Sequence, residues 1–437
     1  MNKKNKIFFY LFLLINTIII FYDSEKQNLL TLSIYFLVLN ISSYYFFDKV
    51  LLSLKKIFNI FMYLFFGVAP VLQYKSSTYF FGVNSVINET DMYYGGLLSL
   101  TIIIFHNLMY YFISTKKLTP EIKFPTKRLE VNFDFKIVSS VLIILLSLFV
   151  VTIFFDFESF ISARYLKGLK GYKFYAINFF RDTLRLIPLF YLLNFKQGKV
   201  KDLRVEIVLI LSILLFNFPT AISRFQVALV YLPLFYFYFK KLQEYFVLVF
   251  LSSFLLIFPY LHNFRYSLKL QRDNYNFFGM FNSLHFDTFQ NTISVIKLSI
   301  ITNGEQLFGS LLFFIPRSIW AEKSRTSSLL LCNEIEFDGF CNIALSFFGE
   351  GYINFGYVGL TLFLLFLAYF NAFFDKTYLN YNSSSFNSFY FIFIFYEFYL
   401  LRGSLTSSIQ KLLIIILALN LLLLINYIMS YKKYTFN

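Results

Sequence analysis

The chain has 437 residues, of which 58% are apolar and only 14% are charged. Soluble domains carry about 25% charged residues, so this composition excludes a soluble globular protein. The 39 lysines and arginines exceed the 24 acidic residues and give a net charge of +15, which is typical of the basic cytoplasmic loops of inner-membrane proteins and requires no nucleic-acid partner.

The apolar runs predict an all-α, polytopic membrane protein with about twelve transmembrane helices, because each span uses about 20 residues. The first run, Ile7 to Tyr22, follows a basic start and has no small-residue cleavage pattern before Asp23, so we expect an uncleaved helix. Further apolar runs lie at 28–47, 57–72, 92–113, 135–155, 174–194, 205–218, 221–239, 245–262, 353–374, 386–401 and 409–429.

The loops between these runs predict the orientation. One set of loops holds about 21 lysines and arginines and the opposite set about eight, so both termini are expected in the cytoplasm. Residues 263–342 then form one large extracytoplasmic loop. It separates a membrane domain at 1–262, with about nine spans, from a C-terminal membrane region at 343–437, with about three.

Both cysteines, Cys332 and Cys341, fall in this predicted loop. An oxidising compartment favours a disulfide between them. Two unpaired thiols remain an alternative, because spacing does not fix geometry. The chain has no CxxC, HExxH, GxxxxGK[ST] or GxSxG motif, so neither a metal site nor another cofactor is expected.

Ionisable residues inside the spans are the best functional signal, since they are costly in a membrane. In the sixth run Arg181 should lie roughly 10 Å below the outer boundary, while Asp182 can pair with Arg185 three residues later. Arg224 should lie about one turn below the outer surface, where snorkelling is the alternative. Arg402 ends the eleventh run on the same side, as does Glu397 in that run.

Several arginines near the outer surface suit an anionic ligand such as a diphosphate, because one guanidinium group can donate two parallel hydrogen bonds to phosphate oxygens. Glycosyl transfer on that face would need a sugar already attached to a lipid carrier. A sugar hydroxyl would attack the anomeric carbon as lipid diphosphate leaves, and His285, Asp287 or Glu350 could accept the proton. His106, toward the cytoplasmic half, is expected to be structural.

The segment Phe348 to Gly359, FGEGYINFGYVG, resembles the C-terminal signature of bacterial oligosaccharide repeat-unit polymerases, the Wzy or O-antigen polymerase family. Pro316-Arg317-Ser318-Ile319-Trp320 with Lys323, Ser223-Arg224-Phe225 and Arg402-Gly403 resemble further parts of that family. Its glycines would also allow a bend and close packing.

The resemblance implies polymerisation of undecaprenyl-diphosphate-linked oligosaccharides into O-antigen or capsular polysaccharide, on the outer face of the bacterial inner membrane. Membrane lipid, a chain-length regulator and a flippase are the implied partners. Together with the charge pattern it assigns catalysis to Glu350, Arg224 and Arg402. Substrate binding is expected at Arg181, Arg265, Arg317, Lys323, Tyr352 and Asn354.

Three other functions remain open. About twelve spans with both ends inside is also the plan of a lipid-linked oligosaccharide flippase or other transporter, although the late, long loop breaks the symmetry of two matching halves. A polysaccharide ligase would use similar chemistry. A polyprenyl-phosphate-sugar glycosyltransferase would need an acidic motif in the first outer loop, for which Asp23-Ser24-Glu25 is a candidate.

Overall fold

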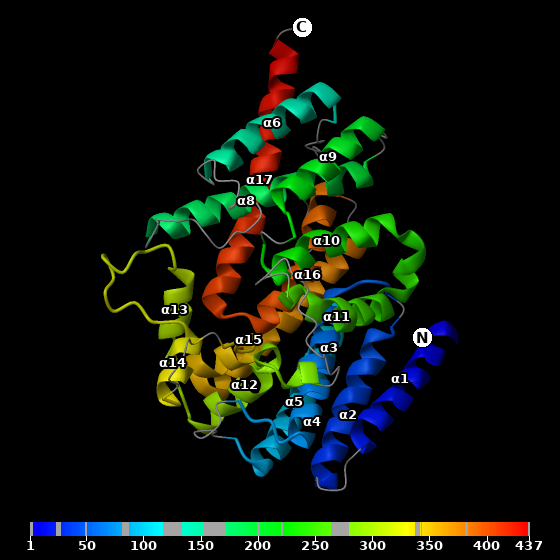
Figure 1. Ribbon diagram of the computed structural model, residues 1–437, viewed down its shortest axis with the longest axis vertical. Helices are drawn as coiled ribbons and strands as arrows, with labels where there is room; N and C mark the ends of the chain where they lie inside the picture. The colour runs from blue at the N-terminus through cyan, green and yellow to red at the C-terminus, as the bar shows by residue number, and fades with distance from the viewer. Residues whose placement is uncertain are drawn as a thin grey trace.

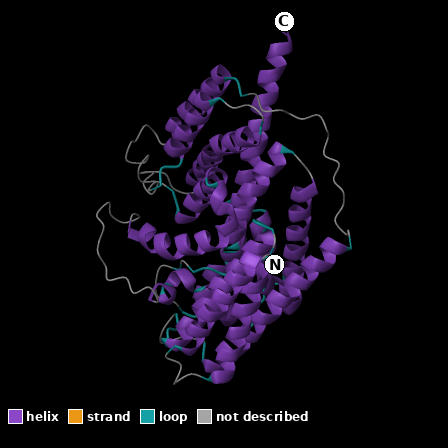
Figure 2. Ribbon diagram, turned by 90° about the vertical axis from the view of Figure 1, so that its right-hand side faces the viewer, coloured by secondary structure: helices purple, strands orange, loops and turns teal. Residues whose placement is uncertain are grey.

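The computed structural model of the protein describes residues 3–22, 28–48, 50–80, 87–116, 133–152, 172–198, 202–219, 222–263, 279–336, 341, 343–380 and 383–435. Every regular element among these residues is a helix, which confirms the all-α prediction (Figure 2). The first half of the chain contains α1 (Lys3–Phe21), α2 (Leu29–Phe46), α3 (Leu54–Phe61), η1 (Met62–Val68), α4 (Ala69–Lys75), α5 (Glu89–Thr115), α6 (Phe135–Thr152), α8 (Tyr172–Gln197) and α9 (Leu203–Phe216).

The second half of the chain is also helical. Its elements are α10 (Arg224–Tyr238), η3 (Lys240–Tyr245), α11 (Phe246–Asn263), η4 (Gly279–Asn282), η5 (Leu284–Phe286), α12 (Thr288–Lys297), α13 (Glu305–Leu311), α14 (Ser327–Glu334), α15 (Phe347–Asn380), α16 (Ser384–Arg402) and α17 (Leu405–Thr435). In the view of Figure 1, α1 to α5 lie in the lower half together with α12, α14 and α15, while α6, α8 and α9 lie in the upper half beside α17.

Long apolar helices identify a membrane protein. Within the described residues seven segments are long and apolar enough to cross a bilayer: Lys4–Phe21, Leu29–Phe46, Leu54–Lys75, Glu89–Thr115, Phe135–Thr152, Phe347–Asn380 and Leu405–Met429. Two further expected spans form α9 and α10, which have 14 and 15 residues, fewer than the roughly 20 that cross a bilayer. The total of about twelve spans, the orientation and the three-part division of the chain therefore stay predictions.

The segment Leu54–Lys75 is the centre of the bundle, with 94% of its span buried. Its first N–H groups need acceptors, as at any helix start. The side chain of Ser53 accepts the Lys56 N–H at 3.2 Å, and Asp375 of α15 accepts the Leu54 N–H at 2.9 Å. A carboxylate from α15 thus fixes the start of α3, and α3 packs against both α15 and α16.

The same central segment turns π-helical over η1 before it continues as α4. Residues 62–68 are all buried. In α4 the Gln73 side chain donates to the carbonyl oxygens of Phe281 and Phe286, at 2.9 and 3.0 Å. The buried helix therefore holds the chain that leads into α12.

The described part of the expected large loop is not extended chain. It forms η4, η5 and α12 to α14, and α12 is buried from Thr288 to Val295. The helix α12 packs against α5, η1 and α15. An aqueous loop would bury few side chains. The large extracytoplasmic loop stays a prediction, and its described part contains a buried helix, α12, whose side chains pack against long helices.

The glycine-rich segment at 348–359 forms a bend inside α15. Phe355 and Gly356 leave helical geometry, and Gly356 has φ +62°, a conformation that favours glycine. Across the bend Gly351 and Gly359 meet: a β-carbon on Gly359 would lie 2.1 Å from the Gly351 carbonyl oxygen. The predicted bend and close packing are confirmed, and glycine at both contact positions is the physical reason.

Candidate functional site

The helices α16 and α17 meet in a tight corner that carries Arg402. Gly403 ends α16, and its N–H donates to the Tyr399 carbonyl oxygen at 2.6 Å. A β-carbon at this glycine would stand 2.9 Å from the same oxygen, so a larger residue would force the backbone to shift. The Leu405 N–H, at the start of α17, donates to Oε1 of Glu350 at 3.1 Å. The corner is therefore fixed both internally and against α15.

Arg402 lies beside the buried Asp287, the residue that precedes α12. Its Nη2 is 3.8 Å from Oδ1 of Asp287, and its guanidinium lies 5.7 Å from the centre of the Phe65 ring. The other carboxyl oxygen of Asp287 accepts the Ala344 N–H at 3.1 Å. Burial raises the pKa of Asp287 to about 6, and the nearby Arg402 opposes this rise. Asp287 thus has the pKa of a group that can exchange protons near neutral pH.

Arg224, the first residue of α10, approaches the same short segment from another helix. Its Nη2 is 3.2 Å from Nε2 of His285. His285 and Asp287 are separated by one residue. The structure therefore brings Arg224 and Arg402, two of the predicted catalytic residues, to one stretch of chain.

Asp182 of α8 connects three helices. Its Oδ1 accepts Nη1 of Arg185 at 3.1 Å, and its Oδ2 accepts Nε2 of Gln226 from α10 at 3.0 Å. The ammonium group of Lys411 in α17 also donates to Oδ2. A small cavity between these helices is lined in part by the same four side chains. The predicted Asp182–Arg185 pair is confirmed, and two further partners join it.

Arg181 adds an incompletely bound guanidinium to this region. The residue is only 5% exposed. Its Nη2 donates to Oδ1 of Asn178 at 2.5 Å, while Nε and Nη1 have no hydrogen-bond partner in the described part of the chain. Buried charged groups are stable only when other groups satisfy them. Arg181, Arg185 and Lys411 are three cations around Asp182, so this region attracts an anion.

Glu350 is buried, with 1% of its surface exposed. Ser327 Oγ of α14 donates to its Oε2 at 2.6 Å, and the Leu405 N–H occupies Oε1. Both oxygens therefore join α15 to neighbouring helices. This geometry favours a positioning role over the catalytic role expected from the sequence.

Tyr352 and Asn354 are likewise engaged inside the protein. Oδ1 of Asn354 accepts the Leu307 N–H at 2.7 Å, and its Nδ2 donates to the Glu350 carbonyl oxygen at 2.8 Å. The Tyr352 hydroxyl lies 3.4 Å from the Ile296 carbonyl oxygen. Asn354 thus fixes the start of α13 on α15. These contacts place both residues in the packing between helices.

The remaining predicted binding residues lie elsewhere. Arg317 is exposed and donates to the Ser324 carbonyl oxygen at 3.1 Å. Lys323 donates to the carbonyl oxygens of Leu312, Phe313 and Ile315, at 3.1, 2.7 and 3.0 Å, which uses the three N–H groups of its ammonium. Arg265 lies outside the described residues.

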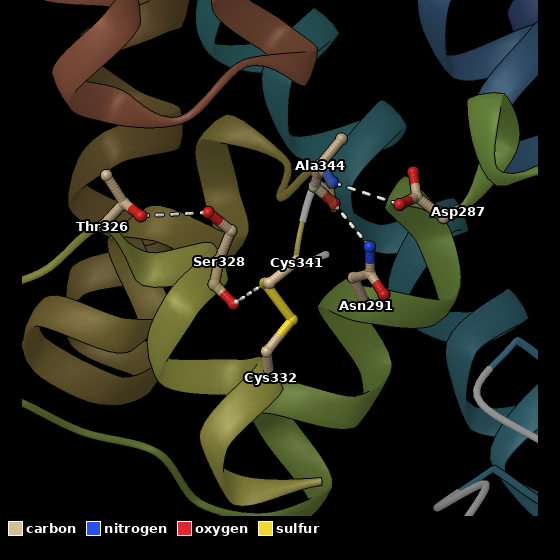
Figure 3. Close-up of a disulfide and its surroundings, with 7 residues drawn as sticks. All are labelled: Asp287, Asn291, Thr326, Ser328, Cys332, Cys341 and Ala344. Carbon is tan, nitrogen blue, oxygen red and sulfur yellow. Dashed lines mark hydrogen bonds between the residues drawn. A yellow bond between two sulfur atoms is a disulfide. The ribbon is translucent and has the colours of Figure 1, made fainter. Parts of the chain in front are cut away.

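The two cysteines are bonded to each other in the structure (Figure 3). The bridge connects Cys332 of α14 to Cys341, close to the chain that enters α15. There the Ala344 N–H donates to Asp287, and its carbonyl oxygen accepts Nδ2 of Asn291 at 2.7 Å. The disulfide therefore restrains the chain that supplies a hydrogen bond to Asp287.

Sequence reasoning missed Gln226 and Lys411 as members of the cluster. Lys411 carried a usable signal, since a lysine inside the apolar run 409–429 is unusual. Gln226 carried none beyond its place two residues after Arg224. No group of three metal-ligating side chains converges within the described residues. No family model matches the chain, and no curated protein or solved structure shows significant similarity to it.

Proposed function

We propose that this membrane protein is a glycosyltransferase that polymerises lipid-diphosphate-linked oligosaccharide repeat units. The observation that carries the proposal is the cluster of Arg181, Arg185 and Lys411 around Asp182, in which two nitrogens of Arg181 have no hydrogen-bond partner among the described residues. A diphosphate offers several oxygens to such a cluster, and guanidinium groups bind them with two parallel hydrogen bonds.

In the proposed reaction an acceptor sugar hydroxyl attacks the anomeric carbon of the donor. The new glycosidic bond forms as the bond to the lipid diphosphate breaks, and the diphosphate leaves with the bonding electron pair. Arg402 and Arg224 stabilise the developing negative charge. Asp287 accepts the hydroxyl proton, since its pKa of about 6 keeps it ionised at neutral pH. Its contact with Arg402 places base and electrostatic stabiliser side by side.

The proposal includes the finer architecture predicted from the sequence. The chain would cross the bacterial inner membrane about twelve times, with both termini in the cytoplasm and the arginine cluster toward the outer face. A flippase would deliver its lipid-linked substrate, and a chain-length regulator would act beside it.

A surface-polysaccharide gel from a deletion strain tests the proposal. Loss of the ladder, leaving core plus one repeat unit, with recovery by the intact gene, is the expected result. Long lipid-linked chains without transfer would indicate a ligase instead, and single units retained on the cytoplasmic leaflet a flippase.

Matched arginine variants test the site itself. Arg181→Ala should fail to restore the ladder at normal expression. Arg204→Ala should restore it, because this arginine is exposed and bonded to the neighbouring Asp202. Equal ladders from both variants would overturn the site assignment.

A further inference from the structure

Three polar side chains from three helices meet in the interior of the bundle. They are His106 of α5, Asn371 of α15 and Glu397 of α16, each at most 1% exposed. Nδ2 of Asn371 lies 2.6 Å from Oε1 of Glu397 and 3.3 Å from Nε2 of His106. The Phe58 ring stacks on the imidazole with 3.6 Å between ring centres. The sequence alone had suggested only an isolated structural histidine at this depth.

The amide of Asn371 determines where protons can reside. An amide nitrogen only donates, so Oε1 of Glu397 and Nε2 of His106 both accept from it. The imidazole is then neutral, with its proton on Nδ1. A carboxyl proton, if present, must lie on Oε2 of Glu397, an atom without a hydrogen-bond partner in the described residues.

Glu397 makes no ion pair within the described part of the chain, and several cations of the surrounding helices pair with other carboxylates. Asp48 pairs with Lys55 and Lys56 of α3, Asp182 with Arg185 of α8 and Lys411 of α17, and Asp287 with Arg402 of α16 itself. Arg224 of α10 contacts His285. An ionised carboxylate inside a membrane protein without a cation is strongly disfavoured.

Asp375, one turn along α15 from Asn371, is a natural comparison. It is also buried, at 3% exposure. Its oxygens accept the Leu54 N–H at 2.9 Å, the Lys55 N–H at 3.3 Å and the hydroxyls of Tyr110 and Tyr390 at 2.9 and 2.6 Å. Several donors directed at a carboxyl group stabilise its ionised form. Two buried acids in one domain thus have opposite surroundings.

We propose that Glu397, Asn371 and His106 form a proton-binding site inside the membrane domain, which holds one proton on Oε2 of Glu397 at neutral pH. The site lies on the helix that carries Arg402, five residues away, or about 7.5 Å along the helix axis. Release of the proton would place a negative charge on α16 that competes with Asp287 for Arg402. The ligand is the proton itself, and the site does not depend on the proposed polymerase activity.

Infrared difference spectroscopy on the full-length protein in lipid vesicles tests this proposal without an activity assay. The spectrum of the wild type minus Glu397→Gln at neutral pH should show the carbonyl band of a protonated carboxylic acid that shifts in heavy water. The spectrum of the wild type minus Asp375→Asn should show carboxylate bands instead. Carboxylate bands for Glu397, or a protonated-acid band for Asp375, would overturn the assignment.

Thermal unfolding of the same two variants gives an independent check that does not need the spectral band. Glutamine replaces a neutral acid without changing its shape or charge, so Glu397→Gln should unfold at nearly the wild-type temperature. Asp375→Asn directs an NH2 group toward N–H and O–H donors and should unfold at a clearly lower temperature. A large destabilisation by Glu397→Gln at neutral pH would overturn the proposal, because it would mean that a charge had been removed.

Discussion

The guanidinium of Arg402 lies 3.8 Å from the carboxylate of Asp287, and this contact joins the end of α16 to the chain that enters α12. Asp287 is fully buried, whereas the Arg402 side chain is 32% exposed. The pair therefore has one end inside the protein and one end open to a ligand. This asymmetry suits an arginine whose exposed end binds substrate and whose other end contacts the carboxylate proposed as the base.

Replacement of Arg402 by alanine should lower the rate of polymerisation by about a hundredfold, because it removes one preorganised cationic group and leaves Asp287 without its cation. Arg402→Lys keeps the charge but loses the planar guanidinium that donates two parallel hydrogen bonds, so it should retain only part of the rate. The measurement is polymer formed by protein in vesicles supplied with lipid-linked repeat units. An unchanged rate for the alanine variant would exclude this residue from the site.

Protein stability should depend on pH through Asp287. Its pKa is raised from 3.8 to about 6, so at intermediate pH the native protein binds more protons there than the unfolded chain. The free energy of unfolding should therefore fall as pH rises from about 4 to about 6 through this group. Asp287→Asn should remove that part of the dependence. Thermal unfolding of both proteins across this range checks the sign, and identical pH profiles would contradict it.

Removal of the disulfide should destabilise the region that joins α14 to α15. The cysteines are separated by nine positions. Without the bridge the unfolded chain gains conformational entropy, which lowers the free energy of unfolding by about 2.5 kcal/mol for a ring of this size. In Cys332→Ser the chain at Ala344 is less restrained, so Asp287 should lose part of its hydrogen bonding. Denaturant unfolding of wild type under oxidising and reducing conditions gives the magnitude. The serine variant should show no difference between the two conditions.

The bend in α15 should tolerate no side chain at Gly359. A β-carbon would lie 2.1 Å from the Gly351 carbonyl oxygen, so Gly359→Ala should destabilise the protein by about 1–3 kcal/mol or abolish its accumulation. Gly198→Ala is the control, because its nearest atoms would be 3.4 Å away. Equal stability of the two variants would show that the helices can separate at the bend without cost.

The segment from α13 to Trp320 should contact lipid. Phe308, Phe314 and Ile319 are 59%, 66% and 78% exposed, and α13 is bonded to the bend of the candidate span α15. Trp320 is the single tryptophan of the chain, and tryptophan favours the membrane interface. Lipids brominated near their headgroups should quench its fluorescence, while aqueous iodide should quench it little. Strong iodide quenching without lipid quenching would place this segment in water.

Local patterns predicted the fold better than the site. The helical class and the Asp182–Arg185 pair follow from composition and from a spacing of three residues, which needs no knowledge of tertiary structure. His106 and Glu397, nearly 300 positions apart, both bind Asn371, and single-sequence periodicity carries no information about such contacts. Lys323 was predicted to bind substrate, but its ammonium group donates to three backbone carbonyl oxygens. No sequence motif reveals such acceptors.

The π-helical turn η1 has a consequence for the rotational phase of the buried central helix. Each residue advances an α-helix by about 100°, so deletion of one residue between Met62 and Val68 would rotate α4 by about that angle relative to α3. Gln73 would then face away from the carbonyl oxygens of Phe281 and Phe286. Because His285 lies between these two anchors and Asp287 directly follows the second, the number of residues in this buried turn sets the position of the proposed catalytic segment.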